Sequence, residues 1–400
     1  MLRTNRLFRV ILFPALLIAS VLASGQGTAT TPIKVAIDAE FGIPGSTSAQ
    51  AIRNGAQVAA DEINRAGGVL GRPLEIVQRD NRGIPARASN NLRELAADPD
   101  VVAVLCGKYS PVVVELLPEI HRLKMPFLNP WAAADPITEH GFRPDYVFRL
   151  SLRDTWAVRT MLEHAGRRGL RRLGLLLPNS EWGRSNLRAA QRAVAGRPGQ
   201  EIAGLEWYNF GDQTLVTHYR NLRATGAEAI LLVANEQEGV VFVNELARLP
   251  EKERLPVLSH WGITAGRFSE RTRASLPGLD LAVVQTFSFL GRSDPEVRRL
   301  LRGLKQLTGN DDPRKVESPV GVAHAYDLVH LLARAIEKSG NTDRAGIRDA
   351  LEQLGPYEGV TRKLARPFAP DRHEALSDDT VFMARFAADG AIEPSRAGRR

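Results

Sequence analysis

The sequence predicts an α/β protein with two doubly wound lobes, and three observations support that prediction. Ile33–Ala39 (IKVAIDA) is typical of a buried strand, and from Ile52 to Ile63 apolar residues recur at three- and four-residue steps, as on one face of a helix. The glycine-rich turn Asn64–Gly71 then leads into a second strand, Pro73–Asp80, which completes a β-α-β unit of a parallel sheet. Because 400 residues exceed one ordinary core, we expect two lobes.

The same alternation continues to about residue 355. Apolar runs of strand length predict further strands at Val101–Cys106, Pro126–Asn129, Arg172–Leu177, Ile202–Tyr208, Ala229–Ala234, Leu255–Ser259 and Leu281–Thr286. Helical periodicity predicts helices at Ala86–Ala97, Pro111–Leu123, Thr155–His164, Arg184–Ala195, Leu215–Arg223, Gln237–Arg248, Pro295–Leu307, Val320–Glu337 and Thr342–Leu354. Asp154 is expected to cap the helix that it precedes, and a hairpin is expected around Val381–Phe386.

Residues 1–25 form a separate segment with the pattern of a secretory signal peptide. Arg3, Arg6 and Arg9 precede the uncharged apolar run Val10–Leu22, and small residues follow it. The run is short for a membrane span and contains a proline, which disfavours the alternatives of a membrane anchor or a buried helix. Gln26 stands where a lipoprotein would have cysteine, so we expect an exported protein that is free in the periplasm.

Composition excludes several classes of protein. The chain is 44% hydrophobic and 24% charged, which is typical of a soluble globular protein. Its formal net charge is +8, but arginine is spread along the chain without a basic block, so we expect no nucleic-acid partner. The single cysteine, Cys106, permits no disulfide within the chain and ends an apolar run, so a buried, inert thiol is expected.

The sequence contains none of the common catalytic or metal-binding motifs. Phosphate loops, nucleophile elbows and paired histidine or cysteine motifs are absent, and the eight histidines are scattered. His324 and His330 are six residues apart on one predicted helix, which does not place them on one face. We therefore expect no catalytic residues, no metal and no cofactor.

The loop after the strand Val101–Cys106 is the first candidate for a ligand-binding site. In doubly wound sheets, ligands bind outside the carboxyl ends of the strands. Pro111 is expected at the first helical position, which makes Ser110 the N-cap beside free amides that favour a carboxylate. Lys108 and Tyr109 belong to the same loop. The alternatives are that Ser110 only caps its own helix and that Lys108 is solvated.

Three of the five tryptophans lie in loops that follow predicted strands or begin helices. Trp131, Trp182 and Trp261 would offer ring faces for stacking or for binding a cation. We include Asn235, after the strand Ala229–Ala234, among the ligand-binding residues. The hypothesis is a ligand with a flat ring or apolar bulk, and the alternative is that the tryptophan rings pack on the lobes or on one another.

These elements resemble a known family. The run G-A-x-x-A-x-x-x-I-N-x-x-G-G-x-x-G-x-x-L-x-x-x-x-x-D, from Gly55 to Asp80, is similar to the first β-α-β unit of periplasmic solute-binding proteins of the branched-chain amino acid (Leu/Ile/Val-binding) type. Ala325–Ile336 resembles a late helix of that family, and Gly359–Thr361 resembles its F-x-G-V-x-G segment without the final glycine.

The resemblance implies a type I periplasmic-binding fold, in which two Rossmann-like lobes joined by a three-strand hinge close on a ligand. Chain crossings are then expected near residues 148–151, 283–290 and 359–361. Lobe 1 would comprise residues 32–150 plus 284–358, and lobe 2 residues 151–283 plus 359–393.

The resemblance also implies roles for the candidate residues. The serine matching Ser110 holds a ligand carboxylate in amino-acid-binding relatives, and Ala132 matches a backbone contact. Ala134 stands where a hydroxyl residue would be, and Trp182 stands where a tyrosine is common. An acidic partner for a ligand ammonium is missing between Ser259 and Gly266, which disfavours an ordinary α-amino acid.

The function that the resemblance implies is that of a periplasmic receptor for an ABC importer. It would capture a small organic solute, either amino-acid-like or an aromatic carboxylate, by hinge closure and without chemistry. Its partner would be an inner-membrane ABC permease, and it would act as a monomer. The alternatives are a ligand-sensing protein of the same fold, such as an amide sensor or a receptor domain, and an exported enzyme.

Overall fold

The computed structural model describes residues 1–2 and 30–395 of the chain. The predicted signal peptide, residues 1–25, therefore lies outside the described residues except for the first two. From Thr31 onward the chain forms one compact unit. Among the described residues, none of the helices is both long and apolar enough to cross a membrane.

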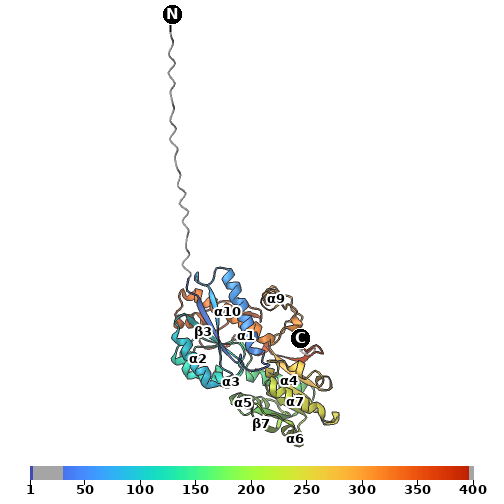
Figure 1. The fold of residues 1–400 in the computed structure, drawn as a ribbon. Helices are drawn as coiled ribbons and strands as arrows, with labels where there is room; N and C mark the ends of the chain where they lie inside the picture. The colour runs from blue at the N-terminus through green and yellow to red at the C-terminus, as the bar shows by residue number, and fades with distance from the viewer. Residues whose placement is uncertain (3–29, 396–400) are drawn as a thin grey trace. The chain divides into compact units, whose positions relative to one another are not determined.

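The first half of the chain builds a five-stranded parallel sheet in the order β2-β1-β3-β4-β5. Helix α1 packs against α9 and α10, and α2 packs against α3; Figure 1 shows α1, α2, α3 and α10 around β3. The strands are β1 Ile33–Ala39, β2 Leu74–Asp80, β3 Val101–Cys106, β4 Phe127–Asn129 and β5 Val147–Arg149. The helices are α1 Ser48–Arg65, α2 Pro85–Ala97, α3 Ser110–Arg122, α9 Pro295–Thr308, α10 Pro319–Ser339 and α11 Arg344–Glu352.

A second sheet of seven strands has the order β14-β13-β10-β9-β8-β6-β7, in which β13 runs antiparallel to both of its neighbours, β10 and β14, and the other neighbouring pairs are parallel. Figure 1 shows α5 and α6 near β7. The strands are β6 Arg172–Pro178, β7 Glu201–Tyr208, β8 Ala229–Leu232, β9 Val257–Ser259, β10 Leu281–Gln285, β13 Phe382–Phe386 and β14 Ile392–Pro394. The helices are α4 Asp154–Arg167, α5 Glu181–Ala195, α6 Val216–Ala224, α7 Glu236–Arg248 and α8 Phe268–Arg271. Two short strands, β11 Tyr357–Glu358 and β12 Lys363–Leu364, form a separate two-stranded sheet.

Burial follows from the layered architecture. Every residue of β3 is buried, because a parallel sheet is covered by helices on both faces. The helix α10 buries most of its residues, including the polar His324 and Asp327, between α1 and α11. Asp327 accepts hydrogen bonds from the amides of Val360 and Thr361, both at 2.8 Å, which satisfies its buried carboxylate.

The chain passes between the sheets at three places, and the last of them differs from the prediction. The first crossing separates β5 from α4, and the second separates β10 from α9. Beyond the predicted third crossing at residues 359–361, residues 373–375 still lie beside the first sheet. There Arg149 donates its amide to the carbonyl of His373, and Ala375 donates to the carbonyl of Arg149, both at 2.8 Å. The crossing therefore falls between Ala375 and β13.

The predicted α/β fold class and the order of the elements are confirmed, with boundaries that shift by a few residues. One local prediction is wrong. Asp154 lies within the first turn of α4, and Arg153 occupies the N-cap position without a side-chain capping bond. The buried carboxylate of Asp154 instead accepts a hydrogen bond from Trp182 and lies beside His260.

Candidate functional site

Loops that follow parallel strands of both sheets meet in one region, which we call the inter-sheet site. The first sheet contributes residues 107–110 after β3 and residues 130–135 after β4. The second contributes Asn235 and Glu236 at the start of α7, and residues 260–265 after β9. Doubly wound sheets hold ligands at this edge, because the carboxyl ends of parallel strands lie together there.

A buried ion pair links the two sheets within this site. The ammonium of Lys108 lies 2.6 and 2.7 Å from the two carboxylate oxygens of Glu236 and 3.1 Å from the hydroxyl of Ser46. The side chains of Lys108 and Glu236 are 0% and 3% exposed, so the expectation of a solvated lysine is wrong. Glu40 adds a second buried carboxylate, which accepts a hydrogen bond from the Lys108 amide at 3.3 Å.

Two tryptophans, one from each sheet, form a second contact between the sheets within this site. The ring centroids of Trp131, after β4, and Trp261, in the short helix η3 (Trp261–Thr264), lie 5.5 Å apart. Both side chains are fully buried, and Gly321 of α10 lies so close to Trp131 that a β-carbon there would approach its ring to 2.8 Å. The two tryptophan rings therefore pack on one another. This arrangement agrees with the alternative given in the sequence analysis and not with an open aromatic pocket.

Trp182 belongs to a different contact group, made by the second sheet alone. Its indole Nε1 donates to Asp154 at 3.1 Å, and its ring meets His260 edge-on at 5.0 Å. His260 Nε2 lies 3.0 Å from the same Asp154 oxygen. The other oxygen of Asp154 and both ring nitrogens of His260 are buried and have no aligned hydrogen-bond partner within residues 30–395. Gly262 permits this packing, because a β-carbon there would lie 2.7 Å from the Trp182 ring.

Ser110 begins α3 and hydrogen-bonds to the neighbouring loop. The helix starts at Ser110, so the N-cap position belongs to Tyr109, and the prediction of Ser110 as the N-cap is wrong by one residue. The Ser110 hydroxyl accepts hydrogen bonds from the amides of Ala133 and Ala134, at 3.1 and 3.2 Å. A carboxylate bound at Ser110 would therefore have to compete with, or share, the amides of its own loop.

The remaining predicted residues lie around the same region. Tyr109 meets Phe210, which follows β7, edge-on at 6.0 Å, so this pair also joins the two sheets. The Lys108 ammonium lies 5.2 Å from the Tyr109 ring centre. Asn235 occupies the N-cap position of α7 beside Glu236, and the carbonyl of Ala132 accepts a hydrogen bond from Asn129 at 2.7 Å.

Residues expected to be inert behave accordingly. Cys106 is buried, and this burial raises the pKa of its thiol. His324 is fully buried and lies 2.9 Å from the carbonyl of Pro130, and burial lowers its pKa to about 4. His330, on α10, has a side chain that is 20% exposed, and it lies 3.5 Å from Glu62.

Sequence reasoning missed the acidic groups of the site. Glu236 and Glu238 both lie in the first turn of α7, and burial raises the pKa of Glu238. Acidic residues in a first helical turn are usual, because they complement the helix dipole, and nothing in the sequence distinguishes Glu236 from such residues. Residues 259–266 contain no acidic residue, as the sequence shows, and the buried carboxylate of the site comes from Glu236 in a different loop.

Comparison with known proteins places this geometry in a family. Residues 32–391 match the family described as periplasmic binding protein. The chain belongs to that family. It is 26% identical, over 90% of its length and 91% of the relative's, to a leucine-, isoleucine-, valine-, threonine- and alanine-binding protein of Pseudomonas aeruginosa.

Solved structures confirm the type I fold of this periplasmic binding protein. A periplasmic binding protein type 1 from Bordetella pertussis superposes with a TM-score of 0.82 at 20% identity, covering 91% of this chain and all of that one. A solute-binding protein of an ABC transporter from Rhodopseudomonas palustris, in complex with 4-hydroxybenzoate, gives 0.74 at 17% identity, covering 91% and 96%. The family assignment makes this chain a periplasmic binding protein, as the resemblance predicted.

Proposed function

We propose that this protein captures a small organic solute at the inter-sheet site and delivers it to an inner-membrane ABC permease. The observation that carries the proposal is the convergence of Lys108 and Trp131, from the first sheet, with Glu236 and Trp261, from the second. A solute held by both sets of residues would favour the closed arrangement over an open one. Differential affinity for the two arrangements is what drives closure.

The chemistry of the site supports an amino-acid-like solute or an aromatic carboxylate. Lys108 is a partner for a carboxylate, and Glu236 is a partner for an ammonium group. Trp131 and Trp261 offer apolar ring faces, which suit a branched aliphatic chain or a flat ring. The Pseudomonas relative is named for binding five amino acids, and the Rhodopseudomonas structure holds 4-hydroxybenzoate, so both classes occur among similar proteins.

We further propose that the two sheets define two lobes joined by the three crossings. One lobe comprises residues 32–150 and 284–358, and the other comprises residues 151–283 and the C-terminal hairpin. We assign residues 359–376 to the first lobe because Arg149 pairs with His373 and Ala375 there. Export by residues 1–25, a free periplasmic state and a monomer that docks on a permease complete the proposal.

A thermal-shift screen tests this function. The purified protein would be heated with leucine, isoleucine, valine and 4-hydroxybenzoate, each in large excess. A true ligand at a hundredfold excess over its Kd stabilises the folded state by about 2.7 kcal/mol, which raises the melting temperature. We expect either the branched-chain amino acids or 4-hydroxybenzoate to raise the melting temperature, and we expect Trp131→Leu to abolish this shift.

Trp156→Leu is the matched control, because Trp156 lies on α4 and packs against Arg153 rather than against Trp261. It should keep the shift. An equal shift in wild type and in Trp131→Leu would refute the site, and conversion of the solute to a product would refute its role as a binding protein.

A further inference from the structure

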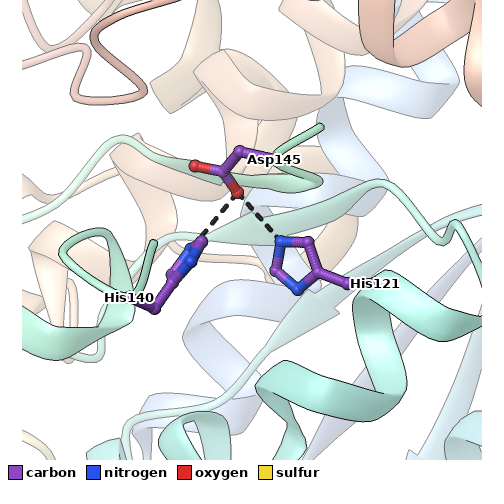
Figure 2. A group of neighbouring side chains, drawn as sticks. All are labelled: His121, His140 and Asp145. Carbon is purple, nitrogen blue, oxygen red and sulfur yellow. Dashed lines mark hydrogen bonds and ion pairs between the residues drawn. The ribbon is translucent and has the colours of Figure 1, made fainter. Parts of the chain in front are cut away.

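Three side chains from separate segments of the first sheet converge away from the inter-sheet site. His121 lies in the last turn of α3, His140 follows the short helix η1 (Asp135–Ile137), and Asp145 lies two residues before β5. The Nε2 atoms of both histidines lie 3.3 Å from the same oxygen of Asp145, as Figure 2 shows. The three ligand atoms all lie within 4.8 Å of one another. The side chains are 8%, 3% and 7% exposed.

The hydrogen bonds of His121 direct a lone pair at this carboxylate. Its Nδ1 donates to the carbonyl of Leu117 at 2.7 Å, which leaves Nε2 without a proton in the neutral ring. Nε2 then faces the Asp145 oxygen and the amide of Tyr146, each at 3.3 Å. A lone pair and a carboxylate oxygen at this distance repel unless a proton or a metal ion lies between them. Histidine ligands of metals commonly donate their other ring N–H to a carbonyl in this way.

His140 supplies an unpartnered buried nitrogen. Its Nε2 is buried and has no aligned hydrogen-bond partner in the part of the chain that the structure describes, although it points toward Asp145. Its Nδ1 accepts a hydrogen bond from the amide of Phe142 at 3.1 Å. Metal binding at Nε2 would move the ring proton to Nδ1, so the Phe142 amide would have to turn away. Residues 141–144 are exposed, so this local change does not disturb the core.

Other protein groups hold the Asp145 carboxylate in position. The oxygen that faces the histidines accepts the Val147 amide at 2.9 Å, and the other oxygen lies 3.2 Å from His373 Nδ1. Deprotonated ligands with such outer partners are what a metal requires.

Two of the three separations between the ligand atoms match those around a tetrahedral ion. Zinc bonds of about 2.0–2.1 Å to nitrogen and 2.0–2.2 Å to oxygen place neighbouring ligand atoms about 3.3 Å apart. Both Nε2-to-oxygen separations have this length. Two imidazoles and one carboxylate suit zinc and its neighbours in the first transition series better than calcium or magnesium.

We propose that His121, His140 and Asp145 bind one divalent transition-metal ion, with Zn²⁺ as the preferred ion. Three protein ligands leave one tetrahedral position for water. The ion would fasten the end of α3 and the segment after η1 to the start of β5. It would thus stabilise the edge of the first sheet without taking part in solute binding.

Equilibrium dialysis of the chelator-treated protein against Zn²⁺ tests the proposal, with bound metal measured by mass spectrometry. We expect one equivalent to bind, and we expect His140→Gln to weaken the affinity at least tenfold. His218→Gln is the matched control, because His218 pairs with Glu206 on the second sheet and should leave Zn²⁺ binding unchanged. His140 is suited to substitution because the backbone amide of Phe142 is its only aligned partner among the described residues.

Co²⁺ provides a second readout that does not depend on the stability of a variant. Wild type loaded with Co²⁺ should show the intense visible absorption bands of a tetrahedral nitrogen–oxygen site, and H121Q and H140Q should lose them. The proposal is overturned if wild type retains no Zn²⁺ after dialysis, or if H140Q and H218Q bind Zn²⁺ equally well.

Discussion

The Lys108 ammonium lies 2.6 Å from the Glu236 carboxylate, and this contact joins a loop of the first sheet to the first turn of α7 in the second. Both side chains are buried, so each charge depends on the other in place of water. The pair therefore stabilises the closed arrangement of the two sheets, because in that arrangement each buried charge has an opposite charge beside it. Removing one partner would leave an isolated buried charge. Opening of the site would let water reach that charge, so the open arrangement would be favoured.

Glu236→Gln and Lys108→Met should each destabilise the closed arrangement by about 3–5 kcal/mol, the usual cost of breaking a buried pair. The double variant, which buries no charge, should recover most of this loss. Small-angle X-ray scattering should report a larger radius of gyration for each single variant than for wild type or the double variant.

Glu358→Gln is the control for this measurement. Glu358 forms an exposed ion pair with Lys363, and its loss should cost less than about 1 kcal/mol. If E236Q has the compactness and stability of wild type, the ion pair has no part in closure.

The buried pair of Arg149 and Glu374 should stabilise the edge of the first sheet. Arg149 Nε donates to Glu374 at 2.9 Å, and its Nη1 donates to the carbonyl of Ala134 at 2.9 Å, so it also restrains the loop of the inter-sheet site. Glu374→Gln should lower the free energy of unfolding by about 3–5 kcal/mol in urea denaturation.

Asp389→Asn, which breaks an exposed pair with Arg314, serves for comparison and should change stability by less than about 1 kcal/mol. If E374Q and D389N lowered the free energy of unfolding equally, the claim that burial makes the Arg149–Glu374 pair more important than an exposed pair would be contradicted.

His324 should make stability depend on pH in the acidic range. Burial lowers its pKa to about 4 in the folded state, against about 6.5 in an unfolded chain. Between these values the unfolded chain binds more protons, so stability is full above pH 6.5 and falls as the pH decreases. The loss between pH 7 and pH 4 should be about 3 kcal/mol from this residue.

Urea denaturation of wild type and His324→Gln at several pH values isolates this contribution, because other groups titrate in both proteins. The difference in unfolding free energy between the two should shrink as the pH falls from 7 to 4. A difference that is constant with pH would show that His324 does not titrate as a buried imidazole.

Most of the fold follows from local sequence, whereas the partners within the site do not. The strand Val101–Cys106 is an unbroken apolar run, and Pro295 begins a helix capped by Asp294, so both elements are evident locally. β5 has only three residues and gives no periodic signal. Residues 359–376 contain no long element, so their pairing with β5 could not be read from a pattern.

The loops of the site could be located because they follow predicted strands, but their contacts could not. Lys108 and Glu236 are 128 residues apart, and only the approach of the two sheets brings them together. His121, His140 and Asp145 have no motif spacing, and they meet because the end of α3 lies beside the start of β5. Ser110 is the first residue of α3 and not its N-cap, and its hydrogen bonds to Ala133 and Ala134 depend on the loop after the neighbouring strand.

Hydrogen–deuterium exchange with and without the solute found by thermal shift tests the central claim most directly. A solute held between the sheets should slow exchange in residues 107–111 and 131–135 of the first sheet and in residues 235–240 and 260–265 of the second. Protection of both sets, absent in Trp131→Leu, is the result that this account predicts. Protection confined to the loops of one sheet, or lying elsewhere in the chain, would contradict it.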